Sequence, residues 1–305
     1  MKVRIHKAFE VKYKSLLKDE YAKLEMCMMT RPKDSIRVNT LKISKDELLW
    51  RLEKMVKFTE IPWYKNGLFV DGAVTLAKTL EHFMGFFHIQ DAASMIPPIV
   101  LAPRQDDFVL DMCASPGSKT TQIAMMMNDS GLIVANDNGL NRIKPLQINL
   151  QRMGVKNCVV TYGKGEMFWR HNVKFDKILL DVPCSGSGKI ISSASSLDKW
   201  SQRAVEKMSR MQKNLLSSAV KCLKEEGSIV YSTCSMDPEE NEEVIDFAVK
   251  ELGLKTEAIK IDGLICTEGF MEYRNKTFDS EVSKAIRIHP YHNFTEGFFV
   301  CKLKK

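Results

Sequence analysis

The stretch DDFVLDMCASPGSKTTQIAMMM, residues 106–127, decides the fold of this 305-residue chain. Its first seven residues predict an apolar strand, residues 113–119 a short loop with one proline and one glycine, and residues 120–127 a helix. A strand that leads through a tight loop into a helix is typical of sheets in which a ligand binds beyond the carboxyl end of the strand. The stretch therefore predicts a nucleotide-like binding site.

Strands and helices alternate after this stretch. We expect strands over residues 131–137, 157–162, 175–181 and 227–234, helices over 142–153, 201–223 and 239–252, and two closing strands near 285–288 and 297–303. This alternation predicts an α/β fold built on a doubly wound parallel sheet. Between two of these elements, residues 183–196 form a long Ser- and Gly-rich loop, and such loops in compact domains are usually functional.

The first 85 residues lack the alternation. Residues 13–28 have helical periodicity, residues 35–41 alternate like a strand, and residues 44–55 predict a helix with Ser44 as its N-cap. We therefore expect a small α+β domain over residues 1–85, followed by the larger domain over residues 86–305.

Composition bounds the function only loosely. The net charge of +7 suits a polyanionic partner such as RNA, but it equally suits an ordinary, slightly basic protein. No apolar run is long enough to cross a bilayer and no signal peptide is evident, so we expect a cytoplasmic monomer with no membrane partner. The eight cysteines include no C-x-x-C pair and no zinc spacing, which predicts free thiols and no metal.

The loop at residues 113–119 predicts a small adenosine-containing cofactor. Gly117 allows close approach of the backbone, and the following helix offers free N–H groups to an anion such as the carboxylate of a methionine moiety. Asp137 ends the next strand, where an acidic residue typically holds ribose hydroxyls. The loop has neither the dinucleotide nor the P-loop glycine pattern. The alternative is a turn whose Gly and Pro serve the backbone only.

Two cysteines, Cys184 and Cys234, follow predicted parallel strands and so share the ligand side of the sheet. A thiolate that adds to carbon 6 of cytosine makes carbon 5 nucleophilic enough to take a methyl group, and a base must then remove the carbon 5 proton. Asp181 is placed to hydrogen-bond the exocyclic amine or ring nitrogen 3. The alternatives are chance placement of two small residues and a structural role for Asp181. The residues alone leave open which cysteine attacks.

Several long segments resemble the Sun (Nol/Nop/Sun) family of RNA cytosine-5 methyltransferases. The resemblance extends over nearly the whole chain in the family's order, and the N-terminal segments are most like the archaeal tRNA members. The segments are IRVNTLK (36–42), FFHIQDAASMIPPIVL (86–101), DMCASPGSKTTQIA (111–124), FDKILLDVPCSG (175–186), VYSTCSMDPEENEEV (230–244) and TEGFFVCKLKK (295–305).

The resemblance implies a class I S-adenosylmethionine methyltransferase domain, an RNA-recognition-like N-terminal domain, and methylation of cytosine in RNA, by the archaeal likeness tRNA. By position it implies that Cys234 is the nucleophile, that Cys184 helps to release product, and that Lys119 and Asp181 belong to the catalytic pocket. The implied cofactor-binding residues are Cys113, Ala114, Ser115, Pro116, Gly117, Ser118, Lys119, Asp137, Arg142 and Asp181.

One departure from the family concerns the adenine end of the cofactor site. Family members usually carry an acidic residue after the third strand of this domain, whereas here Gly163 stands at that place and Lys164 follows. Either Glu166 substitutes for it or the cofactor binds more weakly.

RNA contact is expected at Arg37 and Asn39, and an ordinary surface or core role is favoured for Trp63, Tyr64, Arg203 and Arg210. Three alternative functions stay open. The substrate can be rRNA instead of tRNA, it can be a protein or small molecule, or the chain can be a non-catalytic RNA-binding protein that keeps the fold.

Overall fold

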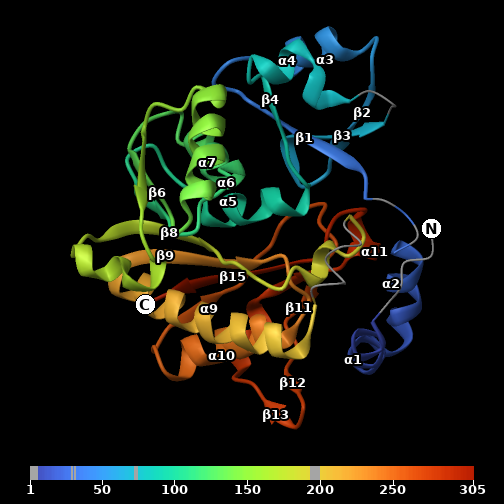
Figure 1. The fold of residues 1–305 in the computed structure, drawn as a ribbon, viewed down its shortest axis with the longest axis vertical. Helices are drawn as coiled ribbons and strands as arrows, with labels where there is room; N and C mark the ends of the chain where they lie inside the picture. The colour runs from blue at the N-terminus through green and yellow to red at the C-terminus, as the bar shows by residue number, and fades with distance from the viewer. Residues whose placement is uncertain (1–5, 29, 31, 72–74, 193–199) are drawn as a thin grey trace.

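The fold was obtained as a computed structural model, which describes residues 6–28, 30, 32–71, 75–192 and 200–305 (Figure 1). A large mixed sheet forms its centre, with strand order β11-β14-β15-β9-β8-β5-β6-β7 and β10 paired to β15. Five neighbouring strands are parallel: β5 (Phe108–Asp111), β6 (Leu132–Asp137), β7 (Cys158–Tyr162), β8 (Phe175–Asp181) and β9 (Leu223–Thr233). The antiparallel strands are β10 (Lys255–Glu257), β11 (Thr267–Glu268), β14 (Ile286–Ile288) and β15 (Phe298–Lys304).

Helices cover both faces of this sheet. Successive residues of β8 point to opposite faces, so Leu179 packs with α5 and α6 while Ile178 and Leu180 pack with α9 and α10. The doubly wound, Rossmann-like α/β fold predicted from the alternation is therefore confirmed. The helices are α5 (Ile96–Leu101), α6 (Ser118–Met126), α7 (Leu140–Met153), α9 (Gln202–Cys222) and α10 (Glu242–Lys250).

The N-terminal sheet is larger than the sequence predicted. Its antiparallel strands, in the order β2-β3-β1-β4, are β1 (Asp34–Val38), β2 (Lys57–Ile61), β3 (Tyr64–Asp71) and β4 (Phe87–Ile89). Only β1 was expected, because the edge strand β2 is polar and mostly exposed and β3 is interrupted by Gly67. Since β4 pairs with β1, this sheet continues past residue 85, where the domain boundary was expected. Two helices accompany the sheet, α3 (Lys45–Leu52), capped by Ser44 as predicted, and α4 (Leu80–Phe83).

The first two helices pack on the catalytic domain and not on the N-terminal sheet. They are α1 (Lys7–Leu17) and α2 (Tyr21–Cys27), and Figure 1 shows them apart from that sheet, with α2 beside α11 (Pro290–Asn293). Phe9 and Tyr13 of α1 lie in one apolar cluster with Trp200 and Met236. A short hairpin, β12 (Glu272–Tyr273) and β13 (Lys276–Thr277), projects from the same side.

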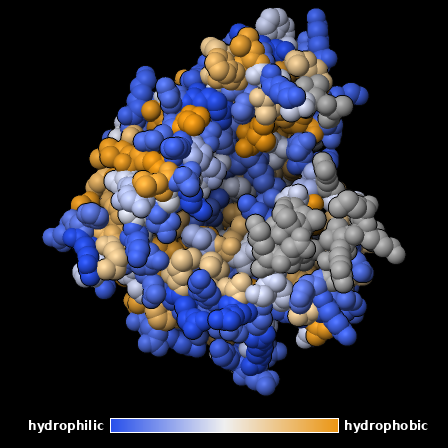
Figure 2. All heavy atoms as spheres, viewed as in Figure 1, coloured by the Kyte–Doolittle hydropathy of each residue, from blue (hydrophilic) through white to orange (hydrophobic). Residues whose placement is uncertain are grey.

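Figure 2 shows a mostly hydrophilic face, hollowed between the N-terminal module and the catalytic sheet. Within the ranges that the structure describes, none of the helices combines the length and apolarity needed to span a bilayer. The predicted loop at residues 183–196 is described as far as residue 192, and its last part lies outside the described residues.

Candidate active site

The two cysteines that were singled out meet at the carboxyl edge of the sheet. Cys234 directly follows β9, Cys184 lies three residues after β8, and their sulfur atoms are 3.0 Å apart. Both thiols are half-buried. The hydrogen bond to Cys234, together with burial, raises the pKa of Cys184 well above its ordinary value, and either sulfur atom can be the donor in this bond.

A cavity of about 330 Å³ lies in front of Cys234. It is lined by Cys234, by Asp181 and by the loop at residues 113–119, which includes Lys119 and which we call the cofactor loop. Cys184 is not among the described residues that line it. The N-terminal part contributes a wall, because Ile89, Gln90, Asp91 and Ser94 also face the cavity. One cavity therefore holds the predicted nucleophile, the predicted catalytic charges and the predicted cofactor loop.

Lys119 and Asp181 form an ion pair inside this cavity. The ammonium group of Lys119, in the first turn of α6, donates to Asp181 Oδ2 at 2.6 Å, and Ser232 Oγ donates to Asp181 Oδ1 at 2.7 Å. The Asp181 side chain keeps 27% of its surface exposed. Two donors thus orient the carboxylate at the end of β8 while part of it still faces the cavity, where it can accept hydrogen bonds from a cytosine amine.

Gly117 shapes the cofactor loop. Its φ of +100° lies in the left-handed region, and a Cβ atom there would come within 2.9 Å of Leu146 Cδ1. Gly117 therefore lets the chain turn sharply into α6 while the loop packs closely on α7. Burial raises the pKa of Cys113 well above its ordinary value, so this thiol remains protonated and serves packing.

Asp137 fixes the cofactor loop through a hydrogen bond to the backbone of Ser115. Its carboxylate accepts hydrogen bonds from Ser115 N at 3.1 Å and Gly139 N at 3.3 Å, and from two nitrogens of Arg142 at 2.9 and 3.2 Å. These four bonds occupy the acceptor positions of a carboxylate. Ribose hydroxyls can reach Asp137 only if the Arg142 side chain, which is 49% exposed, swings aside.

A smaller cavity is lined by Cys113 of the loop together with residues that follow β6 and β7. Asp137, Gly165 and Glu166 line it together with Met211 and Leu215 of α9. Glu166 Oε2 is buried and has no hydrogen-bond partner in the described structure. A Cβ atom built at Gly163 would touch only Asn136 Oδ1, at 3.7 Å, so the place of the expected acidic residue is open.

Comparison with known proteins identifies the family. A family model described as 16S rRNA methyltransferase RsmB/F matches residues 98–304, and one for the N-terminal domain of RsmF matches residues 5–92. The chain belongs to the Sun (RsmB/F) family of RNA cytosine-5 methyltransferases. It is accordingly an S-adenosylmethionine-dependent enzyme, as the sequence predicted. The non-catalytic alternative is thereby disfavoured.

Relatives in this family act on two kinds of RNA. The tRNA (cytosine(49)-C(5))-methyltransferase of Pyrococcus abyssi is 42% identical over 273 residues, covering 89% of this chain and 88% of that one. The ribosomal RNA small subunit methyltransferase F of Shewanella piezotolerans is 41% identical, and the match covers 89% of this chain but 57% of that protein. A crystal structure of NSun6 from Pyrococcus horikoshii with SFG has a TM-score of 0.88 at 26% identity and covers 98% of each chain.

The prediction that Arg37 and Asn39 contact RNA is wrong for this enzyme. Arg37 is fully buried and donates to Gln90 Oε1, Thr121 Oγ1 and the Ser118 carbonyl. Asn39, which follows β1, is also buried, and its amide donates to the carbonyls of Gly85 and Met153. Alternation within one segment could not show that β1 lies between β3 and β4 and faces α6. These side chains join the N-terminal sheet to the catalytic domain and cannot contact RNA.

The four weaker RNA candidates divide into two buried residues and two exposed ones. Trp63 and Tyr64 are buried in the core that the two domains share. Arg203 and Arg210 lie exposed on α9.

Two further residues of this methyltransferase face the cavity and were missed by sequence reasoning. Asp111, the last residue of β5, accepts from Thr120 Oγ1 at 2.7 Å, but its Oδ1 is buried without a partner. Lys189 lines the cavity together with Cys234, and attraction to the sulfur of Cys234 raises the pKa of the lysine. The signal for Asp111 was an acidic residue at the end of an apolar strand. Lys189 gave no signal beyond its place in the loop after Cys184.

Proposed function

We propose that this enzyme methylates carbon 5 of a cytosine in tRNA through a covalent bond between Cys234 and carbon 6 of the base. The observation that carries the proposal is the 3.0 Å sulfur–sulfur contact with Cys234, and not Cys184, facing the cavity. A nucleophile must reach the substrate, and the residue that later assists elimination has to lie next to it.

The residues present fit S-adenosylmethionine, which when bound supplies the methyl group. Residues 113–119 would hold the methionine moiety, with the first turn of α6 offering N–H groups to its carboxylate. The unpartnered oxygen of Asp111 suits the ammonium group of that moiety. Asp137, Arg142 and Glu166 would face the ribose and the adenine.

The protein's own residues then carry the reaction on the base. The Cys234 thiolate adds to carbon 6, and the Lys189 side chain lines the same cavity. Asp181 accepts a hydrogen bond from the exocyclic amine, held in place by Lys119 and Ser232. After carbon 5 has taken the methyl group, Cys184 serves as or positions the base that removes the carbon 5 proton. The double bond between carbons 5 and 6 forms again as the bond from carbon 6 to the Cys234 sulfur breaks, and this sulfur leaves as the thiolate.

The choice of tRNA is supported by the archaeal relative, which is matched over 88% of its length, compared with 57% of the rRNA enzyme. The test is a methyl-transfer assay with isotope-labelled S-adenosylmethionine on purified tRNA, 16S rRNA and mixed protein, followed by bisulfite mapping of the product. We expect label in one cytosine of tRNA. Label in 16S rRNA alone would move the proposal to the second substrate, and label in protein alone would refute it.

A further inference from the structure

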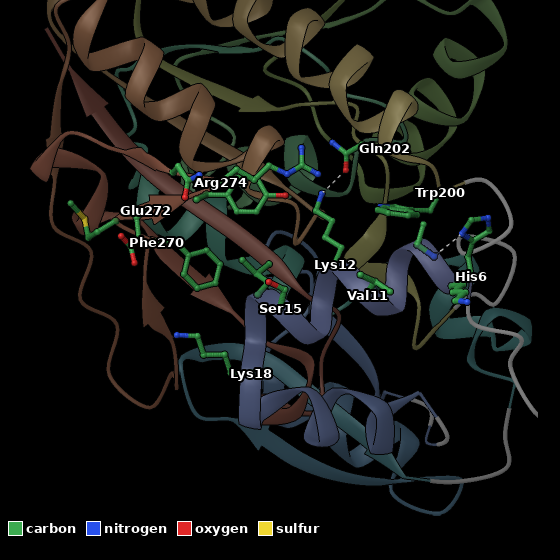
Figure 3. Close-up of a pocket in the computed structure, with 16 residues that line it drawn as sticks. His6, Val11, Lys12, Ser15, Lys18, Trp200, Gln202, Phe270, Glu272 and Arg274 are labelled. Carbon is green, nitrogen blue, oxygen red and sulfur yellow. Dashed lines mark hydrogen bonds between the residues drawn. The ribbon is translucent and has the colours of Figure 1, made fainter.

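A second, larger concavity lies outside the active site. This groove of about 1180 Å³ runs between α1, the start of α9 and the β12–β13 hairpin (Figure 3). We call it the α1 groove. It is lined by His6, Lys7, Ala8, Val11, Lys12, Ser15, Leu16, Lys18, Trp200, Gln202 and residues 270–275.

The α1 groove rests on the loop that carries the nucleophile. Lys12 donates to Asp237 Oδ1 at 2.6 Å and to Glu239 Oε2 at 2.8 Å, and Trp200 Nε1 donates to Asp237 Oδ2 at 3.1 Å. Asp237 lies three residues after Cys234. A chain bound in the groove would therefore run beside the active site and not at a remote surface.

The charges on the groove favour a polyanion. Lys7, Lys18 and Arg274 are exposed along it, whereas Glu272 is the single exposed carboxylate among its described lining residues. In the described part of the chain neither Lys7 nor Lys18 forms an ion pair, and Arg274 only shares Glu239 with Lys12. Exposed cations with few carboxylate partners, on a concave surface, are what a phosphate backbone binds.

Two of these cations have an uncommon backbone conformation. Lys18 has a φ of +49° and Arg274 a φ of +48°, and they are the only lysine or arginine with positive φ in the described residues. Arg274 and Asn275 form the two-residue turn of the hairpin, where Asn-Gly is the favoured pair. L residues with long side chains are strained in this region. Both of these cations line the α1 groove.

Flat apolar side chains complete the groove. Phe270 and Tyr273 are half-buried, and Val11 is exposed. Figure 3 shows Arg274, Lys12 and Gln202 converging on one side, with Phe270 further along the same wall. Aromatic surfaces beside cations bind unpaired bases and their phosphates, whereas a duplex hides its base faces.

We propose that the α1 groove binds a single-stranded RNA segment adjoining the target cytosine, with its phosphates on Lys7, Lys18 and Arg274 and a base against the apolar wall. This inference rests on the proposed RNA methylation. A target base that is unstacked into the catalytic cavity leaves neighbouring nucleotides to be held, and the groove supplies a place for them beside the Cys234 loop.

The test compares two triple variants of the full chain. The variant Lys7→Glu/Lys18→Glu/Arg274→Glu reverses the charge of the three cations in the groove. The variant Arg104→Glu/Lys156→Glu/Lys255→Glu is the matched control. The control residues are two lysines and one arginine, exposed and near the amino ends of strands, on the edge of the sheet opposite to the active site. We expect the groove variant to bind substrate RNA at least about tenfold more weakly, with the slope of log K against log salt reduced by about 2 for three lost contacts to single-stranded phosphates. Binding of S-adenosylhomocysteine should be unchanged.

The outcomes separate this inference from the function. If the wild type methylates RNA but the groove variant keeps its affinity and salt slope, or if the control loses as much, the groove assignment is overturned and the function stands. If the wild type methylates no RNA, the proposed function itself fails. Equal binding of a fully paired duplex, or preferential binding of an acidic peptide such as polyglutamate, also overturns the assignment.

Chemical footprinting locates the RNA directly. Acetylation of Lys7 and Lys18 should decrease when RNA is bound, while that of Lys156 and Lys255 stays constant. Unchanged labelling at Lys7 and Lys18 would contradict the proposal even if affinity had fallen in the triple variant.

Discussion

Cys184 and Cys234 are 50 residues apart in the chain, yet the parallel pairing of β8 and β9 brings their sulfur atoms to 3.0 Å. Cys234 lines the cavity, whereas Cys184 is not among the described residues that line it. This asymmetry between two otherwise similar thiols gives each a different task and makes the tasks separable by mutation.

Replacement of the two cysteines should have opposite effects on the covalent intermediate. Cys234→Ser should abolish methyl transfer and form no adduct, because serine is not ionised at neutral pH. Cys184→Ala should leave RNA covalently attached, because addition at Cys234 remains possible while its release is slowed. A denaturing gel of enzyme incubated with RNA and S-adenosylmethionine shows the adduct as a shifted band.

The matched control is Cys266→Ser, which alters an exposed cysteine outside the cavity and should retain full activity without an adduct. An adduct in Cys234→Ser would contradict the role of Cys234 as nucleophile. Loss of activity without an adduct in both Cys234→Ser and Cys184→Ala would contradict the role of Cys184 in product release.

Asp181 should contribute to the chemical step far more than the serine that holds it. Asp181→Asn keeps the shape but removes the charge that faces the base and pairs with Lys119, so single-turnover methyl transfer should fall by about 10²–10³-fold. Ser232→Ala removes only the hydrogen bond to Oδ1, and a loss below about tenfold is expected. Equal losses in the two variants would mean that Asp181 is a structural carboxylate.

Glu166 should accept a hydrogen bond from the adenine amine of the cofactor. Its Oε2 is buried without a partner and faces the smaller cavity, and the amine of adenine is a donor that needs such an acceptor. Glu166→Ala should weaken binding of S-adenosylhomocysteine about tenfold in calorimetry, and the variant should no longer prefer it over the inosine analogue.

The open space at Gly163 provides a rescue of that variant. Gly163→Asp should restore part of the affinity in the Glu166→Ala background, because its Cβ has room and places a carboxylate where the family resemblance predicted one. Undiminished affinity of Glu166→Ala would show that adenine is held by other groups.

Arg37 should be required for stability and for cofactor binding, and not for RNA contact. Arg37→Met leaves Gln90, Thr121 and the Ser118 carbonyl without their buried donor, which should lower the free energy of unfolding by about 2–4 kcal/mol. Because Ser118 begins α6, affinity for S-adenosylhomocysteine should fall as well. Arg203→Met on the exposed face of α9 is the control and should change stability by less than about 0.5 kcal/mol. A loss of RNA affinity with unchanged stability would restore the surface role.

The strands and motif spacing were predictable because they depend on local chemistry. Apolar runs fix β5, β8 and β9, and parallel strands bring the residues after Asp181 and Thr233 to one edge, so the meeting of Cys184 and Cys234 followed from pattern alone. The burial of Arg37 was not predictable, because it depends on which sheet face α6 covers. The same holds for Lys189 and for the α1 groove, which form only when segments distant in sequence pack together.

Glu240 gives the enzyme a stability that depends on pH. Its carboxylate bonds to the residues that directly follow Cys184 and Cys234, and it accepts from Ser185 N at 3.0 Å, Ser235 Oγ at 2.9 Å and Gln212 Nε2 at 2.8 Å. Burial, and then the charge of Asp237, raises the pKa of Glu240 from 4.5 to about 7. Between these two values the folded protein holds a proton that the unfolded chain has released, so this group's contribution is fully present below pH 4.5 and is lost as the pH rises towards 7.

Glu240→Gln should remove that dependence, because the amide has no proton to lose and keeps most of the contacts. The free energy of unfolding, measured by denaturant titration from pH 5 to pH 8, should therefore fall less with rising pH in the variant than in the wild type. The control is Glu243→Gln, which removes a carboxylate that is 17% exposed and pairs with the exposed Lys276. The free energy of unfolding of this control should depend on pH as it does in the wild type. Parallel curves for wild type and Glu240→Gln would show that Glu240 is already ionised in the folded protein at pH 5.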